Sequence, residues 1–381
     1  MRISVDAHAI GCRLTGNEVY IRNLLKQFAR LDEDSELIAY ISDQSVKADL
    51  PSRIHTRAVS KNPYKRLGLD LPQHLLRDRP DLLHVQYTGP LFSAAPLVVS
   101  VHDVSFLEYP HYFTRFRSLQ LRLTVQKTVH RAARVLTPSE YSRRAILKHY
   151  RIPEEKVIVV PNAVAHQFRP IEREVARTAM QRKFGIRRPF ILTVGDLQPR
   201  KNHLGLLHAF EDVLQAQPKL PHDLVFVGKE SWYSPDLHRE VNRSPVRDRV
   251  HFAGFVDDAD LVKFYGACDL FVFPSFYEGF GLPILEAMAC GRAVACSRAT
   301  AMPEVANAAG ILFDPGSKQE IARAMLDVLL NSELRVRLER LGVHRAAAFS
   351  WEKSAARTLD VYYDVAGRRT RHAAAVAARV S

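Results

Sequence analysis

The stretch that decides the fold is "DLFVFPSFYEGFGLPILEAMACG", residues 269–291. An apolar run of strand length leads into a glycine-rich turn, and a helical pattern follows that closes on a glycine. Pro283 suits the first turn of that helix, where a missing N–H leaves no intrahelical bond unmade. We therefore predict a buried strand, a turn and a helix over residues 283–290, with Glu278 at the exit of the strand and Glu286 in the first helical turn.

The same alternation of strand and helix patterns runs through most of the chain. Strands fit "RISVDA", "ELIAYIS", "DLLHVQ", "PLVVSVH", "ARVLTP" and "KVIVVP" in the first half, and "FILTVGD", "HDLVFVG", "RVHFAG", "DLFVFPS" and "AVACS" in the second. Helices fit residues 17–31, 111–132, 139–149, 202–216, 257–267, 283–290 and 317–330. Short apolar runs separated by helical patterns are typical of parallel sheets covered on both faces. The predicted class is α/β, with two doubly wound parallel-sheet domains.

The length of 381 residues also favours two domains over a single core. We predict a first domain over residues 1–165, a linker over 166–188, and a second domain over 189–350. Residues 351–381 are expected to form a terminal helix and a basic tail. Because ligands of such sheets bind at the carboxyl ends of the strands, we expect the two domains to face each other across a binding cleft.

The net charge of +13 is the one unusual bulk property. It favours anionic partners, although an arginine-rich surface without any such partner explains it equally well. The N-terminus lacks a signal-peptide pattern, and no apolar run has the length of a membrane-spanning helix. The four cysteines form no metal-binding or CxxC pattern. We therefore expect a reduced, cytoplasmic protein.

Residues 277–287 contain two glutamates, Glu278 and Glu286, and no cation that could pair with either. The N-terminus of a helix suits an anion such as a diphosphate, and a carboxylate one turn further on can accept hydrogen bonds from two ribose hydroxyls. In the alternative interpretation, Glu286 complements the helix dipole and Glu278 is a solvated turn residue.

A second polar loop follows the strand in "FILTVGDLQPRKNHLGLLHAF", residues 190–210. It carries Arg200 and Lys201 just before a helix that is capped near Asn202. An arginine fork and a lysine point charge can together clamp a diphosphate. A pair of solvated surface cations is the alternative in so basic a chain.

The run "RVHFAGFVDDADLVKFYGACDLFVFPSFYEGFGLPILEAMACG", with "VGDLQPRKN" before it, resembles the retaining nucleotide-sugar glycosyltransferases of family 4. Glu278 and Glu286 meet the E-x7-E spacing of that family, and "LTPSEYSRRAIL" and "VIVVPN" extend the resemblance over nearly the whole chain. It implies the two-domain GT-B fold. The chain departs from the family pattern at Ala163, where glycine is usual, and at Ala293, which stands where a proline is common.

The resemblance implies a role for each residue of the two polar loops. Glu286 would hold the ribose of the donor nucleotide, and Arg200 and Lys201 would neutralise the departing diphosphate. Glu278 would hold the donor sugar's hydroxyls, which would explain why it lacks a cation partner. The other residues implied at the donor site are Gly279, Phe280, Gly281, Leu282 and Gly195.

Two stretches of the first half add to the implied site. In "PLVVSVHDVSF", His102 and Asp103 directly follow an apolar strand, and the resemblance implies that His102 contacts a hydroxyl of the donor sugar and is no general base. A structural histidine is the alternative. In "GCRLTGNEVYIRNLL", Gly16 would let the backbone approach the diphosphate or the acceptor, unless the glycines here form an ordinary tight turn.

The resemblance thus implies a retaining hexosyltransferase. The stretch "HDVSFLEYPHYF" is similar to bacterial mannosyltransferases that use GDP-mannose, and a saccharide or lipid-linked saccharide in cell-surface polysaccharide synthesis is the expected acceptor. No DxD pair stands at a strand end, since "VDDAD" fits a helix start, so we expect neither a metal nor another cofactor. A UDP-linked donor, a sugar-nucleotide epimerase and a disaccharide synthase of the same fold remain alternatives. A basic nucleic-acid-binding module lacks any supporting motif, and an NAD-linked dehydrogenase lacks the G-x-G-x-x-G fingerprint.

One basic region is left outside this site. In "YFTRFRSLQLRLTVQKTVHRAARV", residues 112–135, and in "SRRAILKHYR" after it, arginine and lysine recur among large apolar residues. Such a pattern is typical of helices that lie on anionic membranes, which predicts peripheral contact with the inner face of the cell membrane. Core packing with a solvated basic face is the alternative.

Overall fold

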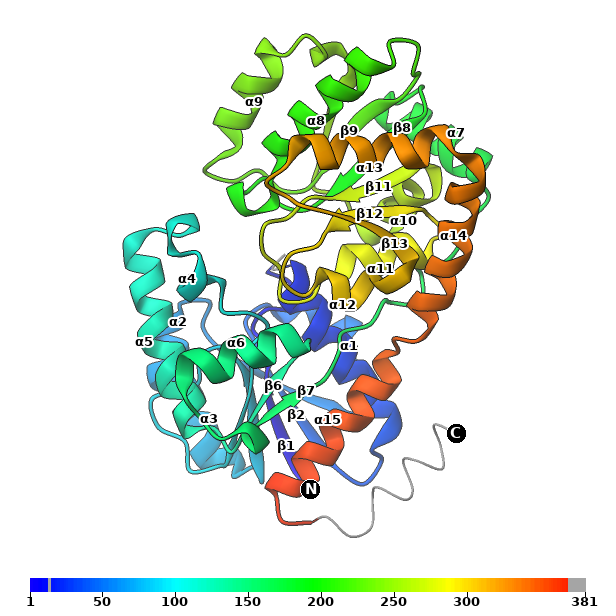
Figure 1. The fold of residues 1–381 in the computed structure, drawn as a ribbon. Helices are drawn as coiled ribbons and strands as arrows, with labels where there is room; N and C mark the ends of the chain where they lie inside the picture. Colours follow the sequence, from blue (N-terminus) through cyan, green and yellow to red (C-terminus); the bar gives the residue numbers. More distant parts are fainter. Residues whose placement is uncertain (13–14, 369–381) are drawn as a thin grey trace. The chain divides into compact units, whose positions relative to one another are not determined.

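The computed structural model describes residues 1–12 and 15–368. The chain forms two compact units, each built around one parallel sheet (Figure 1). The N-terminal unit comprises Met1–Asn162 and the segment that begins at Ser350, and the C-terminal unit comprises Ala163–Phe349. The predicted α/β class with two doubly wound parallel sheets is confirmed.

The sheet of the N-terminal unit has seven parallel strands in the order β3-β2-β1-β4-β5-β6-β7. The strands are β1 (Arg2–Asp6), β2 (Glu36–Ile41), β3 (Ile54–Ala58), β4 (Leu82–Gln86), β5 (Leu97–Ser100), β6 (Arg134–Thr137) and β7 (Val157–Val159). The helices are α1 (Thr15–Leu31), α2 (Pro63–Lys65), α3 (Leu71–Asp78), α4 (Ser105–Glu108), α5 (Arg115–Arg131), α6 (Glu140–Tyr150) and α15 (Trp351–Val365). The direction of winding reverses between β1 and β4.

The sheet of the C-terminal unit has six parallel strands in the order β10-β9-β8-β11-β12-β13. They are β8 (Phe190–Val194), β9 (Asp223–Val227), β10 (Val250–Gly254), β11 (Leu270–Phe273), β12 (Val294–Ser297) and β13 (Gly310–Phe313). The helices are α7 (Arg173–Phe184), α8 (His203–Ala216), α9 (Ser234–Arg243), α10 (Asp258–Ala267), α11 (Leu282–Ala289), α12 (Met302–Ala306), α13 (Lys318–Leu330) and α14 (Ser332–Ala347). Here the winding reverses between β8 and β11.

Successive residues of the central strands enter two different hydrophobic cores, one on each face of the sheet. In β11, Phe271 and Phe273 pack with α10 and α11, whereas Leu270 and Val272 pack with α8 and α13. Because side chains alternate across a strand, only a run that is apolar throughout can serve both cores. This explains why "DLFVFPS" shows no polar alternation.

The sequence did not predict the edge strands β3 and β13, nor the helices α2, α3, α4, α7, α9, α12 and α14. Both edge strands are partly exposed, so their sequences "IHTRA" and "GILF" lack the long apolar run of the central strands. The helix expected from residue 111 begins at Arg115, because Pro110–Tyr112 forms a separate 3-10 turn. Thr114 then caps the helix by accepting a hydrogen bond from the Arg117 N–H at 3.3 Å.

The observed units also differ from the predicted boundaries. Residues 166–188, expected as a linker, contain α7, whose Ala176 and Met180 are buried in the core of the C-terminal unit. A Cβ atom on Gly266 of α10 would lie 2.5 Å from Ile171 Cγ1, so glycine permits the close packing of this segment. Helix α15, expected in a separate C-terminal region, packs with α1 in the N-terminal unit (Figure 1).

Helix α15 supplies part of the N-terminal core. The hydroxyl of its buried Tyr362 lies 2.5 Å from His84 Nδ1 on β4, and its ring packs against Phe28 of α1 with 5.5 Å between centroids. Leu359, one turn before Tyr362, is fully buried. The unit therefore depends on a helix that is distant in the sequence.

The substitution Leu359→Ala should lower the free energy of unfolding of the N-terminal unit by about 3 kcal/mol, because it leaves a cavity in this core. Urea unfolding can be followed by the fluorescence of Trp351, which is buried in the same unit, whereas Trp232 of the other unit is exposed. Arg357→Ala, an exposed change on the same helix, is the control. Equal stability of the two variants would show that α15 adds little to the core.

Candidate functional site

The two polar loops predicted from the sequence meet at the point where the winding of the C-terminal sheet reverses. One loop follows β8 and the other follows β11, and these two strands are neighbours in the sheet. The Phe276 N–H donates to the Arg200 carbonyl at 2.9 Å, and Asn202 Nδ2 donates to the Pro274 carbonyl at 3.2 Å. Such a reversal is where open α/β sheets bind their ligands.

Asn202 fixes the end of the first loop. Its backbone is left-handed, with φ of 56°, a conformation that asparagine tolerates better than most residues. Its Oδ1 accepts the Gly205 N–H at 3.2 Å and so caps α8, as the sequence predicts. Its Nδ2 also donates to the Pro315 carbonyl at 2.7 Å, which ties the loop to the segment after β13.

The loops bring Arg200, Lys201 and Glu278 into direct contact. Glu278 Oε1 lies 3.0 Å from Arg200 Nη1 and 2.7 Å from Lys201 Nζ, and all three side chains are largely buried. Arg200 Nη1 also donates to the Tyr277 carbonyl at 2.5 Å. The interpretation that Glu278 has no cation partner is therefore wrong, because its partners come from a loop 77 residues away in the sequence.

Charge controls the ionisation of this cluster. Burial alone would raise the pKa of Glu278, but the charges of Arg200 and Lys201 outweigh it and lower the pKa to about 2. The carboxylate thus stays ionised at any pH at which the protein would work. Burial, together with the charge of Arg200, lowers the pKa of Lys201. The cluster therefore holds the two cations Arg200 and Lys201 against one permanently ionised carboxylate. Its remaining net positive charge can attract an anionic ligand.

Gly195 provides the space in which Lys201 lies. A Cβ atom at this position would be 3.1 Å from Lys201 Cε and 3.2 Å from Cδ. The Lys201 ammonium also lies over the Phe273 ring, 4.9 Å from its centroid. Gly195 therefore affects the site by leaving room for the Lys201 side chain. A direct contact between Gly195 and the donor stays a prediction.

The turn after Glu278 is held from several sides. The Glu278 N–H donates to Thr300 Oγ1 at 3.1 Å, and Thr300 has φ of 55°, a rare conformation for a β-branched residue. Phe280 packs edge-on against Phe349, with ring centroids 5.8 Å apart. Gly281, with φ of 102°, forms the N-cap of α11, and Leu282 begins the helix. Gly279 lies between these anchored residues.

Glu286 is the fifth residue of α11, so it lies in the second turn rather than the predicted first turn. Only 7% of its surface is exposed, and its Oε2 accepts a hydrogen bond from Tyr265 of α10 at 2.8 Å. Burial raises the pKa of Glu286 to about 7, although the Tyr265 hydroxyl opposes this shift. A buried carboxylate with one hydroxyl partner can accept further hydroxyls.

His102 lies in the N-terminal unit, two residues after β5. Its Nε2 is 2.9 Å from Gln86 Oε1, and its ring meets the edge of Tyr20 with centroids 4.6 Å apart. Burial lowers the pKa of His102 to about 4, so its imidazole is neutral at physiological pH. Asp103 Oδ1 accepts both the N–H and the hydroxyl of Ser105, at 2.8 and 2.6 Å, and so shapes the following turn.

The predicted site residues thus fall into separate groups. Arg200, Lys201 and Glu278 form one cluster, while Glu286 has its hydrogen bond with Tyr265. His102, Asp103 and Gly16 belong to the N-terminal unit, where Gly16 is the second residue of α1 and has open space around it. The roles of these residues stay predictions.

Several neighbours of these residues were missed. Tyr265, Thr300 and Gln86 each contact a predicted site residue, yet no local pattern distinguishes them. Thr137 and Asn162 also line a narrow gap beside His102, which has no room for a water molecule. Among the residues that the structure describes, Thr137 Oγ1 and Asn162 Oδ1 find no hydrogen-bond partner. The only sequence signal for Thr137 and Asn162 is their position at the ends of the predicted strands β6 and β7.

Two negative findings apply to residues 1–12 and 15–368. Within these ranges, no three His, Cys, Asp or Glu side chains are grouped so as to hold a metal ion. None of the helices in the same ranges is both long enough and apolar enough to cross a membrane.

Comparison with known families matches both halves of the chain. Residues 14–168 match the family described as Glycosyltransferase Family 4, and residues 176–344 match Glycosyl transferases group 1. The O-antigen chain mannosyltransferase B of Escherichia coli is 30% identical over 382 residues, which cover 95% of this chain and 99% of that protein.

Two solved structures show the same fold at low sequence identity. Sucrose-phosphate synthase from Thermosynechococcus elongatus superposes with a TM-score of 0.78 at 18% identity, over 96% of this chain and 99% of that one. Anabaena HepE, solved in complex with UDP and glucose, superposes with a TM-score of 0.76 at 19% identity, over 94% and 98%. Both halves of the chain match the family models, and its two polar loops meet where the winding of the second sheet reverses. The chain therefore belongs to the family 4 and group 1 glycosyltransferases and is a glycosyltransferase of the GT-B fold.

Proposed function

We propose that this enzyme transfers mannose from GDP-mannose to a saccharide or lipid-linked saccharide during synthesis of a cell-surface polysaccharide. The cluster of Arg200, Lys201 and Glu278 carries the proposal, because two buried cations held on one carboxylate suit a diphosphate leaving group. The near full-length match to an O-antigen chain mannosyltransferase supports mannose as the sugar. UDP-linked donors remain the alternative, since HepE was solved with UDP.

The proposed reaction retains the configuration at the anomeric carbon and uses no metal ion. The bond between the anomeric carbon and the phosphate oxygen breaks, and its electron pair stays on the diphosphate. Arg200 and Lys201 stabilise that growing negative charge in a largely buried site. The acceptor hydroxyl attacks from the face that the diphosphate leaves, and its proton passes to the departing phosphate oxygen.

Other residues are proposed to bind and orient the donor. Glu286 accepts the two ribose hydroxyls, and the backbone of Gly279, Phe280 and Gly281 binds the sugar. His102 contacts a sugar hydroxyl as a neutral imidazole, which suits its pKa of about 4. We propose that the reaction takes place in the cytoplasm, at the inner face of the cell membrane.

Thermal-shift measurements with GDP-, UDP- and ADP-linked sugars test the donor. A ligand at 100 times its Kd stabilises the protein by about 2.7 kcal/mol, so GDP-mannose should raise the melting temperature clearly above the shift with UDP-glucose. Incubation with donor alone should leave GDP-mannose intact, whereas an epimerase would convert it. A shift with UDP-sugars only would refute GDP-mannose, and an inverted anomeric configuration in the product would refute retention.

A further inference from the structure

Gln86 contacts the ring of His102 from the neighbouring strand. It is the last residue of β4, and β4 pairs with β5, which leads directly to His102. Its Oε1 lies 2.9 Å from His102 Nε2, and only 5% of its surface is exposed. A buried amide is thus the direct neighbour of the imidazole that we place at the donor sugar.

The contact with His102 is the only use that the fold makes of this amide. Within the described residues, Gln86 Nε2 is buried and has no hydrogen-bond partner. A buried donor without a partner is costly, so an apolar side chain would suit the strand better if Gln86 only filled space. The hydrogen bond to His102 is what the glutamine offers and an apolar residue does not.

That hydrogen bond fixes where the proton of the imidazole lies. An amide oxygen accepts hydrogen bonds and cannot donate them, so His102 Nε2 carries the hydrogen. Because burial lowers the pKa of His102 to about 4, the ring holds only this one proton near neutral pH. Nδ1 therefore has a free lone pair and acts as a hydrogen-bond acceptor.

A neutral acceptor differs here from a charged one. A carboxylate in place of the amide would also accept from Nε2, but its negative charge would raise the pKa of His102 and favour a doubly protonated ring. Both nitrogens of such a ring are donors. The glutamine keeps the ring neutral and so preserves the acceptor at Nδ1.

Nδ1 of His102 is open to a ligand. Within residues 1–12 and 15–368 it has no hydrogen-bond partner, and the ring nitrogens that are fully enclosed without one belong to His203 and His222. His102 itself is partly exposed. The acceptor side of the ring can thus meet a hydroxyl group, whereas the donor side is already occupied by Gln86.

Two aromatic rings hold the imidazole in one orientation. Tyr20 and Tyr87 meet it edge-on, with centroid separations of 4.6 and 5.6 Å. Tyr87 follows Gln86 directly, and its backbone is left-handed with φ of 59°, a strained conformation for a bulky residue. Such strain is typical of sites at which a side chain must be placed accurately.

We propose that Gln86 is a positioning residue, which holds the hydrogen of His102 on Nε2 so that Nδ1 accepts a hydrogen bond from a hydroxyl group of the donor sugar. His102 therefore selects a group that can donate, and a sugar without that hydroxyl is bound less well. The inference deepens the proposed function, since it rests on a contact between His102 and the donor sugar.

Nitrogen-15 NMR of the free enzyme tests the tautomer without any donor. Ring nitrogens with and without hydrogen differ in chemical shift, and the variant His102→Gln identifies the His102 signals. The wild type should show hydrogen on Nε2 and a bare Nδ1. In Gln86→Leu the hydrogen should move largely to Nδ1, because Nε2–H would be left buried without an acceptor.

The variant Gln86→Glu gives a second test that does not need the leucine variant to fold. It should keep the wild-type tautomer at pH 8, because its carboxylate also accepts from Nε2. It should also raise the pKa of His102, which the same nitrogen signals measure during a pH titration. An unchanged pKa would show that residue 86 does not contact the ring and would overturn the proposal.

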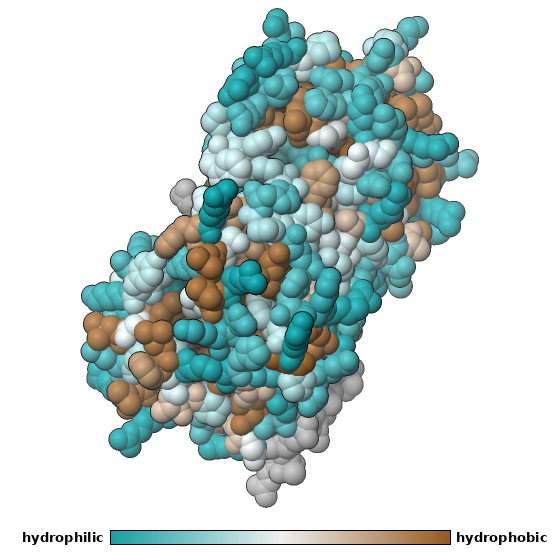
Figure 2. Space-filling model, turned by 60° about the vertical axis from the view of Figure 1, so that its left-hand side comes forward, coloured by the Kyte–Doolittle hydropathy of each residue, from teal (hydrophilic) through white to brown (hydrophobic). Residues whose placement is uncertain are grey.

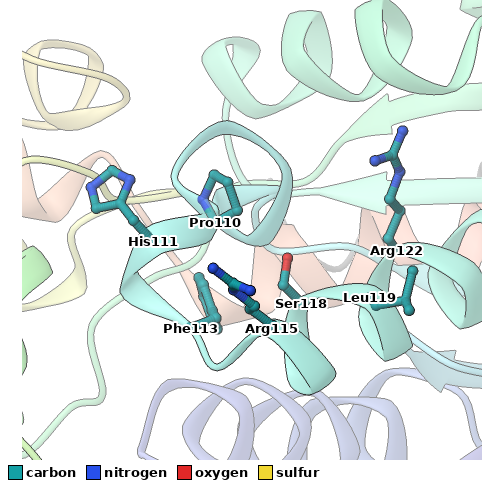
Figure 3. A pocket seen from close by; sticks show the side chains of 7 residues that line it. All are labelled: Pro110, His111, Phe113, Arg115, Ser118, Leu119 and Arg122. Carbon is teal, nitrogen blue, oxygen red and sulfur yellow. The ribbon is translucent and has the colours of Figure 1, made fainter.

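An exposed histidine and an exposed glutamine provide the controls. The surface of the N-terminal unit mixes hydrophilic and hydrophobic side chains (Figure 2), so single changes there have small effects on stability. Figure 3 shows His111 on one side of an open pocket, with Arg122 on the other. His111 is exposed, so its signals should average over both tautomers. Gln126→Leu, at an exposed position of α5, should leave the His102 signals unchanged.

Donor analogues test the consequence for specificity. Fluorine in place of the contacted hydroxyl cannot donate to Nδ1, so the wild type should bind one member of a series of fluorinated donors, each changed at a single hydroxyl, about fivefold more weakly than the natural donor. This is the loss of one neutral hydrogen bond of about 1 kcal/mol. In Gln86→Leu, Nδ1–H can donate to the oxygen of the natural sugar, so the variant should still bind that sugar but lose the discrimination. Gln126→Leu should discriminate as the wild type does.

Other outcomes would overturn the proposal. Hydrogen on Nδ1 of the wild type would show that the amide donates to the ring, and an unchanged tautomer in Gln86→Leu would show that Gln86 does not control it. Equal discrimination by the wild type and Gln86→Leu would show that Nδ1 does not accept from the sugar. Failure of GDP-mannose to bind the wild type, with the expected tautomer in place, would refute the donor assignment and leave the effect of Gln86 on His102 standing.

Discussion

Replacing Arg200 with alanine should lower kcat at least about 100-fold while the protein stays folded. Arg200 is one of the two cations held against Glu278, and its side chain is only 17% exposed. Charge on the diphosphate grows as the sugar leaves, so a prearranged cation stabilises the transition state more than the bound donor. Loss of one such group usually costs about 10²–10³ in rate. The KM for the donor should change much less than kcat.

Two further variants make this test specific. Arg200→Lys keeps the charge and loses the planar fork, so its activity should lie between those of the wild type and the alanine variant. Arg298→Ala removes an arginine of the same unit that pairs with Glu320 at the surface, and its kcat should be unchanged. Melting curves check the fold of each variant. A decrease of less than about threefold in Arg200→Ala would remove this residue from the mechanism.

The structure holds Arg200 in place by its contact with Glu278. Lys201 still holds Glu278 when Arg200 is removed, because its ammonium lies 2.7 Å from the same oxygen. Glu278, with its pKa lowered to about 2, is a permanent anion that fixes both cations before the donor binds. We therefore propose that Glu278 acts on the reaction indirectly, through the position of Arg200 and Lys201, which differs from the sugar-binding role that the resemblance implies.

The sequence predicted the two loops but not their contact. Each loop follows an apolar strand, so its place at a carboxyl edge could be inferred locally. The contact of Glu278 with Arg200 depends on β8 and β11 being neighbours, which is a property of the strand order. In the same way, Tyr265 reaches Glu286 from a different helix, and the strained backbone of Thr300 has no sequence signal.

The predicted domain boundaries differ from the observed ones for a related reason. Polar and charged residues in "EREVARTAMQRKF" hide the narrow apolar face of α7, where Ala176 and Met180 are buried. Helix α15 has a clear amphipathic pattern, but its pattern cannot tell which core it completes. That information lies in pairs such as Tyr362 with His84, which are 278 residues apart.

Replacing Glu286 with glutamine should change the pH dependence of protein stability and, by a different cause, the binding of the donor. Burial raises the pKa of Glu286 from its ordinary value of 4.5 to about 7, so the folded state holds a proton that the unfolded state has released. Because the folded state then binds more protons, stability falls as the pH rises from about 4.5 through about 7. The two pKa values correspond to about 3 kcal/mol lost at pH 8. The glutamine variant lacks this loss and should be more stable than the wild type at pH 8, with little difference below pH 4.5.

The same substitution should raise the KM for the donor at least about 100-fold. Two ribose hydroxyls that donate to a buried carboxylate lose charge-assisted hydrogen bonds when an amide replaces it, at about 1.5–3 kcal/mol for each bond. Donor binding by the wild type should also release a proton near pH 7, because the hydroxyls favour the ionised carboxylate. Calorimetry in buffers of different ionisation enthalpy measures this proton, and the glutamine variant should release none.

Glu333→Gln, at an exposed glutamate near the start of α14, is the matched control for both measurements. It should keep the pH dependence of stability, the proton release and the KM of the wild type. If the Glu286→Gln variant still loses stability between pH 4.5 and 7, another group must titrate in that pH range. An unchanged KM together with a lost pH dependence would mean that Glu286 is a buried structural carboxylate and that the ribose is bound elsewhere. The two readouts depend on different states of one side chain, since stability reports the free enzyme and KM reports the complex.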